Sequence, residues 1–300
     1  MATYIVFILA IAAVYALLAQ SLVLVWGQSG MVNLGLVGFF AIGAYASALV
    51  TTDLAAPVVI GLVCALVAGA LVGLAVTLST LRLRDDYLAI VTLGFAEVVR
   101  IVASNEIWLT NGTDGIAGIP SLFDRSGGLW FHVKFAVAAT LVCLLAGILI
   151  SRLSRSPWGR VLRAIRDDQV VAAVAGKRVV RYKAEAFMIG SAIAALAGAL
   201  YGSYISYIAP DLFQPLITIY VFLAATAGGN SRAIGATIGA YLLVAWLEAS
   251  RFLGEIVPGV SAVQVAALRE ITVGLALVLV LRFAPGGLFR EKNEKAPHAN

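Results

Sequence analysis

Long apolar runs separated by short polar segments make up most of the chain. A helix that crosses the hydrocarbon core of a bilayer needs about 20 such residues. The runs do not alternate apolar and polar residues, as the strands of a transmembrane barrel do, so we expect an all-α, polytopic helical membrane protein. We place about nine spans, with eight to ten as the range, over residues 4–25, 33–50, 57–80, 87–104, 132–151, 184–208, 216–229, 233–250 and 266–283.

Composition supports the membrane assignment. Of 300 residues, 61% are hydrophobic and only 12% are charged, whereas a soluble domain is about half apolar and a quarter charged. The chain therefore has no room for a large soluble domain, and we expect residues 1–300 to form a single transmembrane domain.

Basic residues gather in a few hydrophilic segments and indicate the orientation. Loops rich in Lys and Arg stay in the cytoplasm. With nine spans, Arg82 and Arg84, the segment 152–183 and the tail 284–300 all fall on one side. We expect the N-terminus outside, the C-terminus inside, and a multi-pass location in a bacterial inner membrane, with a cytoplasmic loop 154–183 and a cytoplasmic tail 284–300. The net charge of +5 then reflects orientation rather than nucleic-acid binding.

The loop 154–183 contains the pattern of an amphipathic helix. Ser156 and Pro157 form a helix start, and an apolar face follows, made of Trp158, Val161, Leu162 and Ile165. A second short helix over 170–175 ends at Gly176. One interpretation is an anchor on anionic lipid. We favour a docking helix for a soluble partner, because an anchor would not need two helices and a glycine turn.

Two interrupted segments point to a path for a solute. Residues 216–229 would rise only about 21 Å as a helix, against a core of about 30 Å, and Gly228–Asn230 breaks the run. The stretch Gly27–Gly35 is broken by glycine and by polar side chains. Irregular backbone at membrane depth survives only where it is buried or lines a cavity. A tilted, locally short helix is the alternative for 216–229.

Two charged residues lie inside one predicted span. Glu97 and Arg100 are three positions apart and so share one helical face, where they can pair. Ionisable residues inside a membrane usually face the bundle interior and mark a pathway. The alternative is a self-neutralised pair that only packs.

Small residues recur at four-residue spacing in several spans. One stripe comprises Gly190, Ala194, Gly198 and Gly202, and Gly69/Gly73 and Gly235/Gly239 form pairs. Such stripes let helix backbones approach closely. We favour packing within the chain over a dimer face.

Motifs for catalysis are missing from the sequence. Gly176-Lys177 lacks the upstream glycine and the hydroxyl residue of a P-loop, so we expect this chain not to bind and hydrolyse ATP by a P-loop. His132 and His298 are the two histidines, and Cys64 and Cys143 sit in apolar runs without metal-ligand spacing. We therefore expect no enzymatic activity, no catalytic residue, no metal site and no cofactor in this chain.

Four blocks of sequence, in order along most of the chain, carry a family resemblance. They are Asn33–Tyr45, Leu81–Arg100 continuing to the 111–120 loop, Gly159–Asp168 followed by Gly176 and Arg181–Lys183, and Ala197–Tyr201 leading to Pro210. Together they resemble LivM-type permeases of branched-chain amino acid ABC importers, the partners of LivH-type permeases. Leu36 stands where many relatives carry His.

The resemblance implies a permease subunit that moves a small polar solute, most simply a branched-chain or other amino acid. Its implied partners are a LivH-like second permease, two cytoplasmic P-loop ATPases, a periplasmic solute-binding protein and membrane lipid. Coupling to the ATPases would use Arg160, Arg163, Arg166, Asp167, Ala172, Ala173 and Gly176. The path would use Asn33, Gly35, Leu36, Phe39, Phe40, Thr92, Glu97 and Arg100.

Other functions stay open from the sequence. Related importers carry urea, short amides or aromatic acids. A different class, an ion-gradient-driven secondary transporter or channel, would need a chain of acidic residues at mid-membrane, for which Glu97 alone qualifies.

Overall fold

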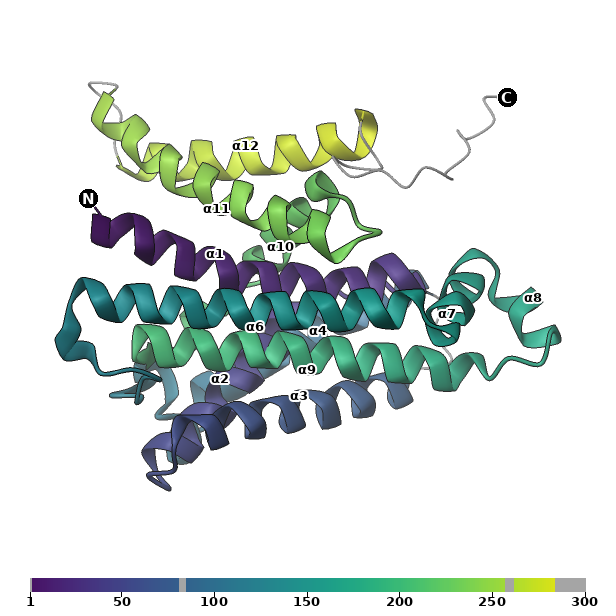
Figure 1. Ribbon diagram of the computed structural model, residues 1–300, viewed down its shortest axis with the longest axis horizontal. Helices are drawn as coiled ribbons and strands as arrows, with labels where there is room; N and C mark the ends of the chain where they lie inside the picture. Colours follow the sequence, from purple (N-terminus) through teal and green to yellow (C-terminus); the bar gives the residue numbers. More distant parts are fainter. Residues whose placement is uncertain (1, 81–84, 257–261, 284–300) are drawn as a thin grey trace.

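The computed structural model describes residues 2–80, 85–256 and 262–283, which form a helical bundle with one small strand pair (Figure 1). The long helices are α1 (Ala2–Leu22), α2 (Leu36–Thr52), α3 (Val58–Thr80), α4 (Asp85–Asn105), α6 (Leu129–Arg155), α9 (Val179–Ile205), α10 (Leu216–Gly228), α11 (Ala233–Ile256) and α12 (Ala262–Phe283). The short elements are η1 (Val23–Gln28), α5 (Ile107–Thr110), η2 (Gly112–Asp114), β1 (Ile116–Ala117), η3 (Arg125–Gly127), α7 (Pro157–Asp167), α8 (Gln169–Val174), β2 (Tyr207–Ile208) and η4 (Pro210–Leu212).

Each of the nine predicted apolar segments coincides with one of the long helices, so the all-α expectation is confirmed. Among the described residues, eight helical segments are long and apolar enough to cross a membrane, and α2 is a shorter apolar helix. The first span extends further than predicted, because α1 continues into the π-helical turn η1 and ends at Gln28. The predicted tail 284–300, Arg82 and Arg84 lie outside the described residues.

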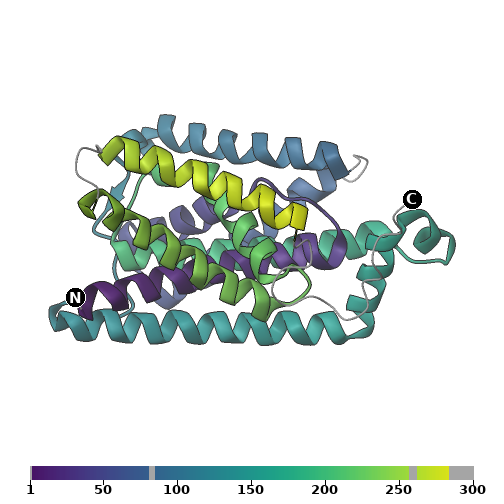
Figure 2. The same cartoon turned by 90° about the horizontal axis from the view of Figure 1, so that it is seen from above.

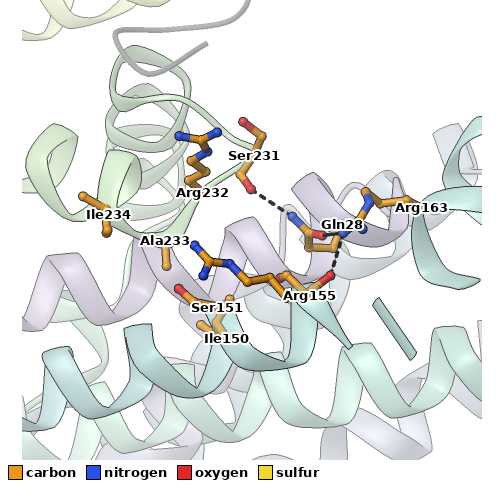
Figure 3. A pocket seen from close by; sticks show the side chains of 10 residues that line it. Gln28, Ile150, Ser151, Arg155, Arg163, Ser231, Arg232, Ala233 and Ile234 are labelled. Atoms are coloured by element: carbon orange, nitrogen blue, oxygen red, sulfur yellow. Dashed lines mark hydrogen bonds between the residues drawn. The ribbon is translucent and has the colours of Figure 1, made fainter. Parts of the chain in front are cut away.

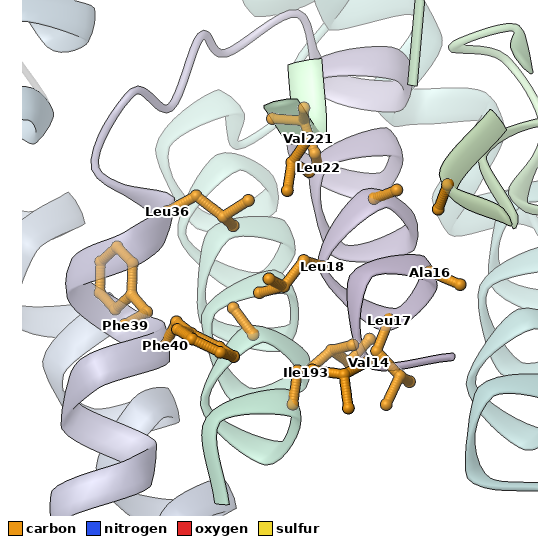
Figure 4. Close-up of a cluster of buried hydrophobic side chains, with 14 of the residues drawn as sticks. Val14, Ala16, Leu17, Leu18, Leu22, Leu36, Phe39, Phe40, Ile193 and Val221 are labelled. Atoms are coloured by element: carbon orange, nitrogen blue, oxygen red, sulfur yellow. The ribbon is translucent and has the colours of Figure 1, made fainter. Parts of the chain in front are cut away.

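The centre of the bundle is an apolar core around α1, α2 and α9. Figure 4 shows leucines of α1 meeting Leu36, Phe39 and Phe40 of α2 and Ile193 of α9. Most of α1 and α9 is buried. In the apolar stretch of α12, by contrast, only 6% of the residues are buried by the rest of the chain. Exposed apolar faces of this size need lipid or another membrane subunit, which agrees with a multi-pass membrane protein.

Glycines bring the helix backbones of the core into direct contact. A Cβ atom on Gly198 of α9 would lie 1.9 Å from the Phe40 carbonyl oxygen of α2. A Cβ atom on Gly69 of α3 would lie 2.4 Å from the Cβ atom of Ala195 of α9. A Cβ atom on Gly239 of α11 would lie 1.9 Å from the Ala224 carbonyl oxygen of α10. The small-residue stripes therefore pack within the chain, as we favoured.

Buried polar side chains also join the helices. The Gln20 side-chain amide of α1 donates to Thr237 Oγ1 of α11 at 2.8 Å and to Cys143 Sγ of α6 at 3.2 Å. Cys143 is buried and Cys64 is half-buried, and both are free thiols.

The two ends of the bundle differ in structure. At one end, α7 and α8 project beyond the long helices, and we call this the α7 end (Figures 1 and 2). The start of α1 lies at the opposite end, where the turn-rich loop predicted at 111–120 forms β1, paired antiparallel with β2. Arg125 fastens this loop to the end of α9 by donating to the Ser203 and Tyr204 carbonyl oxygens at 3.1 and 2.8 Å.

Candidate functional site

The two interrupted segments predicted from sequence meet inside the bundle. Residues 29–35 leave the helix after η1, and α2 begins at Leu36 rather than at the predicted residue 33. The shift has a local cause, because the Asn33 side chain accepts from the Gly35 amide at 2.9 Å and holds the backbone out of a helical turn. The Val37 amide then donates to Thr218 Oγ1 at 3.3 Å, which joins the start of α2 to the start of α10.

Helix α4 contacts the residues just before α2. The Leu34 amide donates to Thr92 Oγ1 at 3.1 Å. Gly35 approaches the α4 backbone so closely that a Cβ atom there would lie 2.1 Å from the Thr92 carbonyl oxygen. The segment 29–35 is therefore held against α4, and the start of α2 that follows it is held against α10.

Aromatic side chains pack around the first turns of α2, directly after the interrupted segment. Phe39 packs against Phe95 and Phe187, with ring centroids 5.0 and 5.6 Å apart. Phe40 packs against Tyr201 and Phe213, each at 5.5 Å. The structure thus brings together six predicted path residues, all buried: Asn33, Gly35, Leu36, Phe39, Phe40 and Thr92.

Some buried polar atoms in this region lack partners. Asn33 Nδ2 and the Tyr45 hydroxyl have no hydrogen bond in the described part of the chain. An unpaired buried polar group costs about 1–3 kcal/mol, so such groups need an explanation.

Glu97 and Arg100 form an ion pair on a half-exposed flank of α4. Arg100 Nε donates to both carboxylate oxygens of Glu97, at 3.1 and 3.0 Å. Arg100 Nη1 also lies 3.8 Å from Asp211 Oδ1 in η4. The pair is therefore not among the buried residues around Asn33, but it ties α4 to the segment that precedes α10.

Helix α7 forms where the sequence predicted it. The Ser156 hydroxyl accepts from the Gly159 amide at 3.4 Å, and Pro157 occupies the first turn. Leu162 and Ile165 are buried, as their apolar face predicted. Trp158 donates from its indole nitrogen to Glu185 Oε2 at 2.8 Å, which fixes α7 to α9.

Helix α8 lies next to α7 and ends as predicted. Asp168 caps its start by accepting from the Val170 and Val171 amides at 2.8 and 2.9 Å. Gly176 has φ +77°, and the Lys177 amide donates back to the Ala172 carbonyl at 3.1 Å. This is the left-handed glycine stop of a Schellman motif.

The arginines of α7 point in different directions. Arg163 Nη1 donates to Gln28 Oε1 at 3.1 Å and to the Ser154 carbonyl at 2.7 Å (Figure 3). Arg166 Nη1 donates to the Gly27 carbonyl at 2.7 Å. Both side chains therefore fasten α7 to the end of η1, immediately before the interrupted segment 29–35.

The other predicted coupling residues lie mostly on the surface. Arg160 and Asp167 are exposed, and Asp167 Oδ1 lies 3.3 Å from Arg166 Nε. Ala173 and Gly176 are exposed, and Ala172 is buried on the inner face of α8, in a cluster with Ile165 and Val179.

Sequence reasoning missed an apolar surface on α8. Val170, Val171 and Val174 are 71%, 63% and 85% exposed, although they lie far from the core. The signal was present as three valines within a strongly hydrophilic loop. A cavity of about 380 Å³ lies between the start of α7, the turn after α8 and the start of α9, and its lining includes Trp158 and Lys177.

The comparisons with known proteins agree with the resemblance of the sequence blocks. The family model described as "Branched-chain amino acid transport system / permease component" matches residues 4–281. The LivM high-affinity branched-chain amino acid permease proteins of Salmonella typhimurium and Escherichia coli K12 are each 34% identical over 265 residues. These alignments cover 81% of this chain and 62% of each relative, so the chain spans about three fifths of their length.

More distant relatives include other permease proteins. The LivH permease protein of Escherichia coli K12 is 29% identical over 247 residues, which cover 76% of this chain and 79% of that protein. The fructose import permease protein FrcC of Rhizobium meliloti is 28% identical over 212 residues, 66% of this chain and 57% of that protein. No solved structure matches the chain. By the match to the family model and by its likeness to LivM proteins, the chain belongs to the family of permease components of branched-chain amino acid transport systems.

Proposed function

We propose that this chain is a permease subunit of an ABC importer that carries branched-chain amino acids, or closely similar small polar solutes, across a bacterial inner membrane. The family membership and the names of the LivM and LivH relatives support this proposal. ATP would be hydrolysed by partner subunits, and this chain would hold no cofactor.

The proposed topology has nine spans in a single domain, with the N-terminus outside. Basic side chains crowd the α7 end, including Arg152, Arg155, Arg160 and Lys177. Since basic segments stay inside, the α7 end would face the cytoplasm. The strand pair β1–β2 would face the periplasm.

The proposed partners fit the surfaces of the bundle. A LivH-like second permease would cover part of the apolar surface of α4, which lies along an outer edge in Figure 2. Two P-loop ATPases would dock on α7 and the exposed valines of α8. A periplasmic binding protein would deliver the solute at the end that carries β1 and β2.

One observation carries the coupling proposal, namely the attachment of α7 to the interrupted segment. Arg166 binds the Gly27 carbonyl and Arg163 binds Gln28, so a displacement of α7 is passed directly to residues 29–35. ATP binding would move α7 and α8 and shift the bundle between outward- and inward-facing states. ATP can drive this only as far as it binds the two states differently.

The solute would pass beside α2 and α10. Asn33 and Tyr45 offer buried, unpaired polar groups, and the Glu97–Arg100 pair lies on α4 beside Asp211, in the segment that precedes α10. Leu36 is buried at the start of α2 and would contribute an apolar wall. Solute choice would rest mainly with the binding protein, so urea, short amides and aromatic acids remain alternatives for the path itself.

Docking and transmission can be separated by two variants of the full importer. Val174→Glu places a charge on the α8 surface and should abolish co-purification of the ATPase subunits. Arg166→Ala should keep those subunits bound but lose leucine uptake and solute-stimulated ATP hydrolysis. Arg152→Ala, an exposed arginine at the same end, is the control.

Two results would contradict the proposal. Wild-type uptake by both variants would show that α7 and α8 do not couple a motor to the bundle. Leucine uptake by the isolated chain in liposomes under an ion gradient would favour the secondary transporter instead.

A further inference from the structure

A polar cavity lies at the α7 end, between α6, the end of η1, α7 and the turn before α11 (Figure 3). Its volume is about 280 Å³. Its polar lining consists of three arginines, three serines and one glutamine, namely Arg155, Arg163, Arg232, Ser151, Ser154, Ser231 and Gln28. No carboxylate is among these lining residues of the described chain, so the cavity is strongly positive. Guanidinium groups beside hydroxyl donors are the chemistry that binds a phosphate.

One wall of this cavity is fixed by internal hydrogen bonds. Gln28 Nε2 donates to the Ser231 carbonyl at 2.9 Å, and Gln28 Oε1 accepts from Arg163. Gln28 itself is 3% exposed. The fixed wall gives the cavity a defined shape before any ligand binds.

The other two arginines have their charge available. Within the described residues, the guanidinium groups of Arg155 and Arg232 have neither a carboxylate partner nor a hydrogen-bond acceptor. In Figure 3 the Arg155 side chain reaches across the cavity toward Ala233 and Ile234 of α11. Two unpaired cations beside one cavity repel each other unless an anion lies between them.

The surroundings favour a lipid as the source of that anion. Ile150 and Ile234 form an apolar part of the lining, and Ile234 is 65% exposed. Farther along the bundle, α6 exposes Leu145 and Ile148, and α11 exposes Leu242. The cavity therefore lies where two apolar outer faces end, at the level that a headgroup occupies above its acyl chains.

We propose that this cavity binds the phosphate group of an anionic phospholipid from the surrounding membrane. The proposal rests on the cytoplasmic placement of the α7 end in the proposed function. Bound lipid would lie against Gln28 and Arg163, and so next to the attachment of α7.

Lipid binding can be measured on the purified full chain by native mass spectrometry. The chain is titrated with phosphatidylglycerol or with phosphatidylcholine, and the double variant Arg155→Gln/Arg232→Gln is compared with wild type. Loss of one basic residue near a membrane surface lowers the affinity for anionic lipid about fivefold. Because the two losses multiply, the double variant should bind phosphatidylglycerol about 30-fold more weakly. The control Arg152→Gln removes an exposed arginine that does not line the cavity and should bind as wild type does.

Each remaining outcome decides the proposal. Equal binding of the two lipids, or equal loss in the control, would overturn it, since diffuse surface charge would then explain binding. Competition by inorganic phosphate at the same concentration as the lipid would replace the lipid with a free anion as the ligand. The single variant Arg232→Gln changes only a residue in the turn before α11 and gives a second reading if the double variant misfolds. Because the readout needs neither solute nor ATPase, a failure of lipid binding can be told apart from a failure of transport.

Discussion

The contact of Gly35 with α4 can be tested by adding a single methyl group. In Gly35→Ala the new Cβ atom would lie 2.1 Å from the Thr92 carbonyl oxygen and 2.7 Å from its carbonyl carbon. Both are backbone atoms, so no change of rotamer can relieve the overlap. Gly35 has φ −90° and ψ 17°, which alanine adopts without a positive-φ penalty. The substitution therefore tests the contact with α4 without adding backbone strain at residue 35.

The expected loss of stability follows from three contributions. Overpacking of this kind costs about 1–3 kcal/mol. A shift of α4 would also weaken the Leu34–Thr92 hydrogen bond, worth about 1 kcal/mol. The lower entropy of the unfolded chain with alanine returns about 0.4–1 kcal/mol. The net destabilisation should be about 1–3 kcal/mol.

Gly94→Ala is the matched control, because Gly94 lies in α4, the helix that Gly35 touches, and a Cβ atom there would meet no neighbouring element within 4 Å. It should be neutral or stabilising by up to about 1 kcal/mol through helix propensity. Both variants are unfolded in mixed micelles by a denaturing detergent, and their midpoints are compared with wild type. If Gly35→Ala unfolds at the same point as Gly94→Ala, α4 does not touch the interrupted segment as described.

Three further predictions concern other contacts. Gly198→Ala should destabilise the bundle by about 1–3 kcal/mol, since its Cβ atom would meet a carbonyl oxygen of α2, and a detergent melting curve checks this. Arg125→Ala should speed amide hydrogen exchange in the loop 106–128 by about tenfold, because one charge-assisted anchor is worth about 1.5 kcal/mol. Gln20→Leu should change stability by less than about 1 kcal/mol, because it removes an unpaired amide oxygen along with two hydrogen bonds. Gln20→Ala, which leaves a cavity, should cost about 2–3 kcal/mol in the same unfolding assay.

Periodicity and capping residues predicted the helices of this chain well. Spans and short helices appear at the expected positions because membrane helices depend on continuous apolar sequence and on local caps. Ser156 and Pro157 start a helix and Gly176 ends one through contacts with residues nearby in sequence. Their effect could therefore be predicted from the sequence.

Directions of side chains were not readable in the same way. Arg163 and Arg166 share their helix with the exposed Arg160, and all three appear equivalent in the pattern. The Arg166 side chain binds Gly27, 139 positions away in sequence, and the Arg163 side chain binds Gln28, 135 positions away. Long-range acceptors of this kind leave no local signal.

The boundaries of the candidate path were missed for a related reason. The start of α2 is set by Asn33, whose side chain competes for the Gly35 amide, and by Thr92 on another helix. Nothing in the apolar run itself marks residue 36 rather than 33 as the first helical position. The buried Asn33 was recognised as a polar interruption, but Phe187 and Tyr201, which pack against Phe39 and Phe40, were not.

The glycine contacts divide the bundle into two stiff units. In one, α2, α3 and α9 touch backbone to backbone, and in the other, α10 and α11 do the same through Gly228 and Gly239. Between them lies α1, whose leucine side chains pack in the core, while its continuation η1 touches the turn before α11, where a Cβ atom on Gly27 would lie 1.8 Å from the Asn230 carbonyl oxygen. We expect relative motion to occur across the leucine side chains of α1. It would first strain the hydrogen bond from the Val37 amide to Thr218, where a gap opening between the two units would expose Asn33.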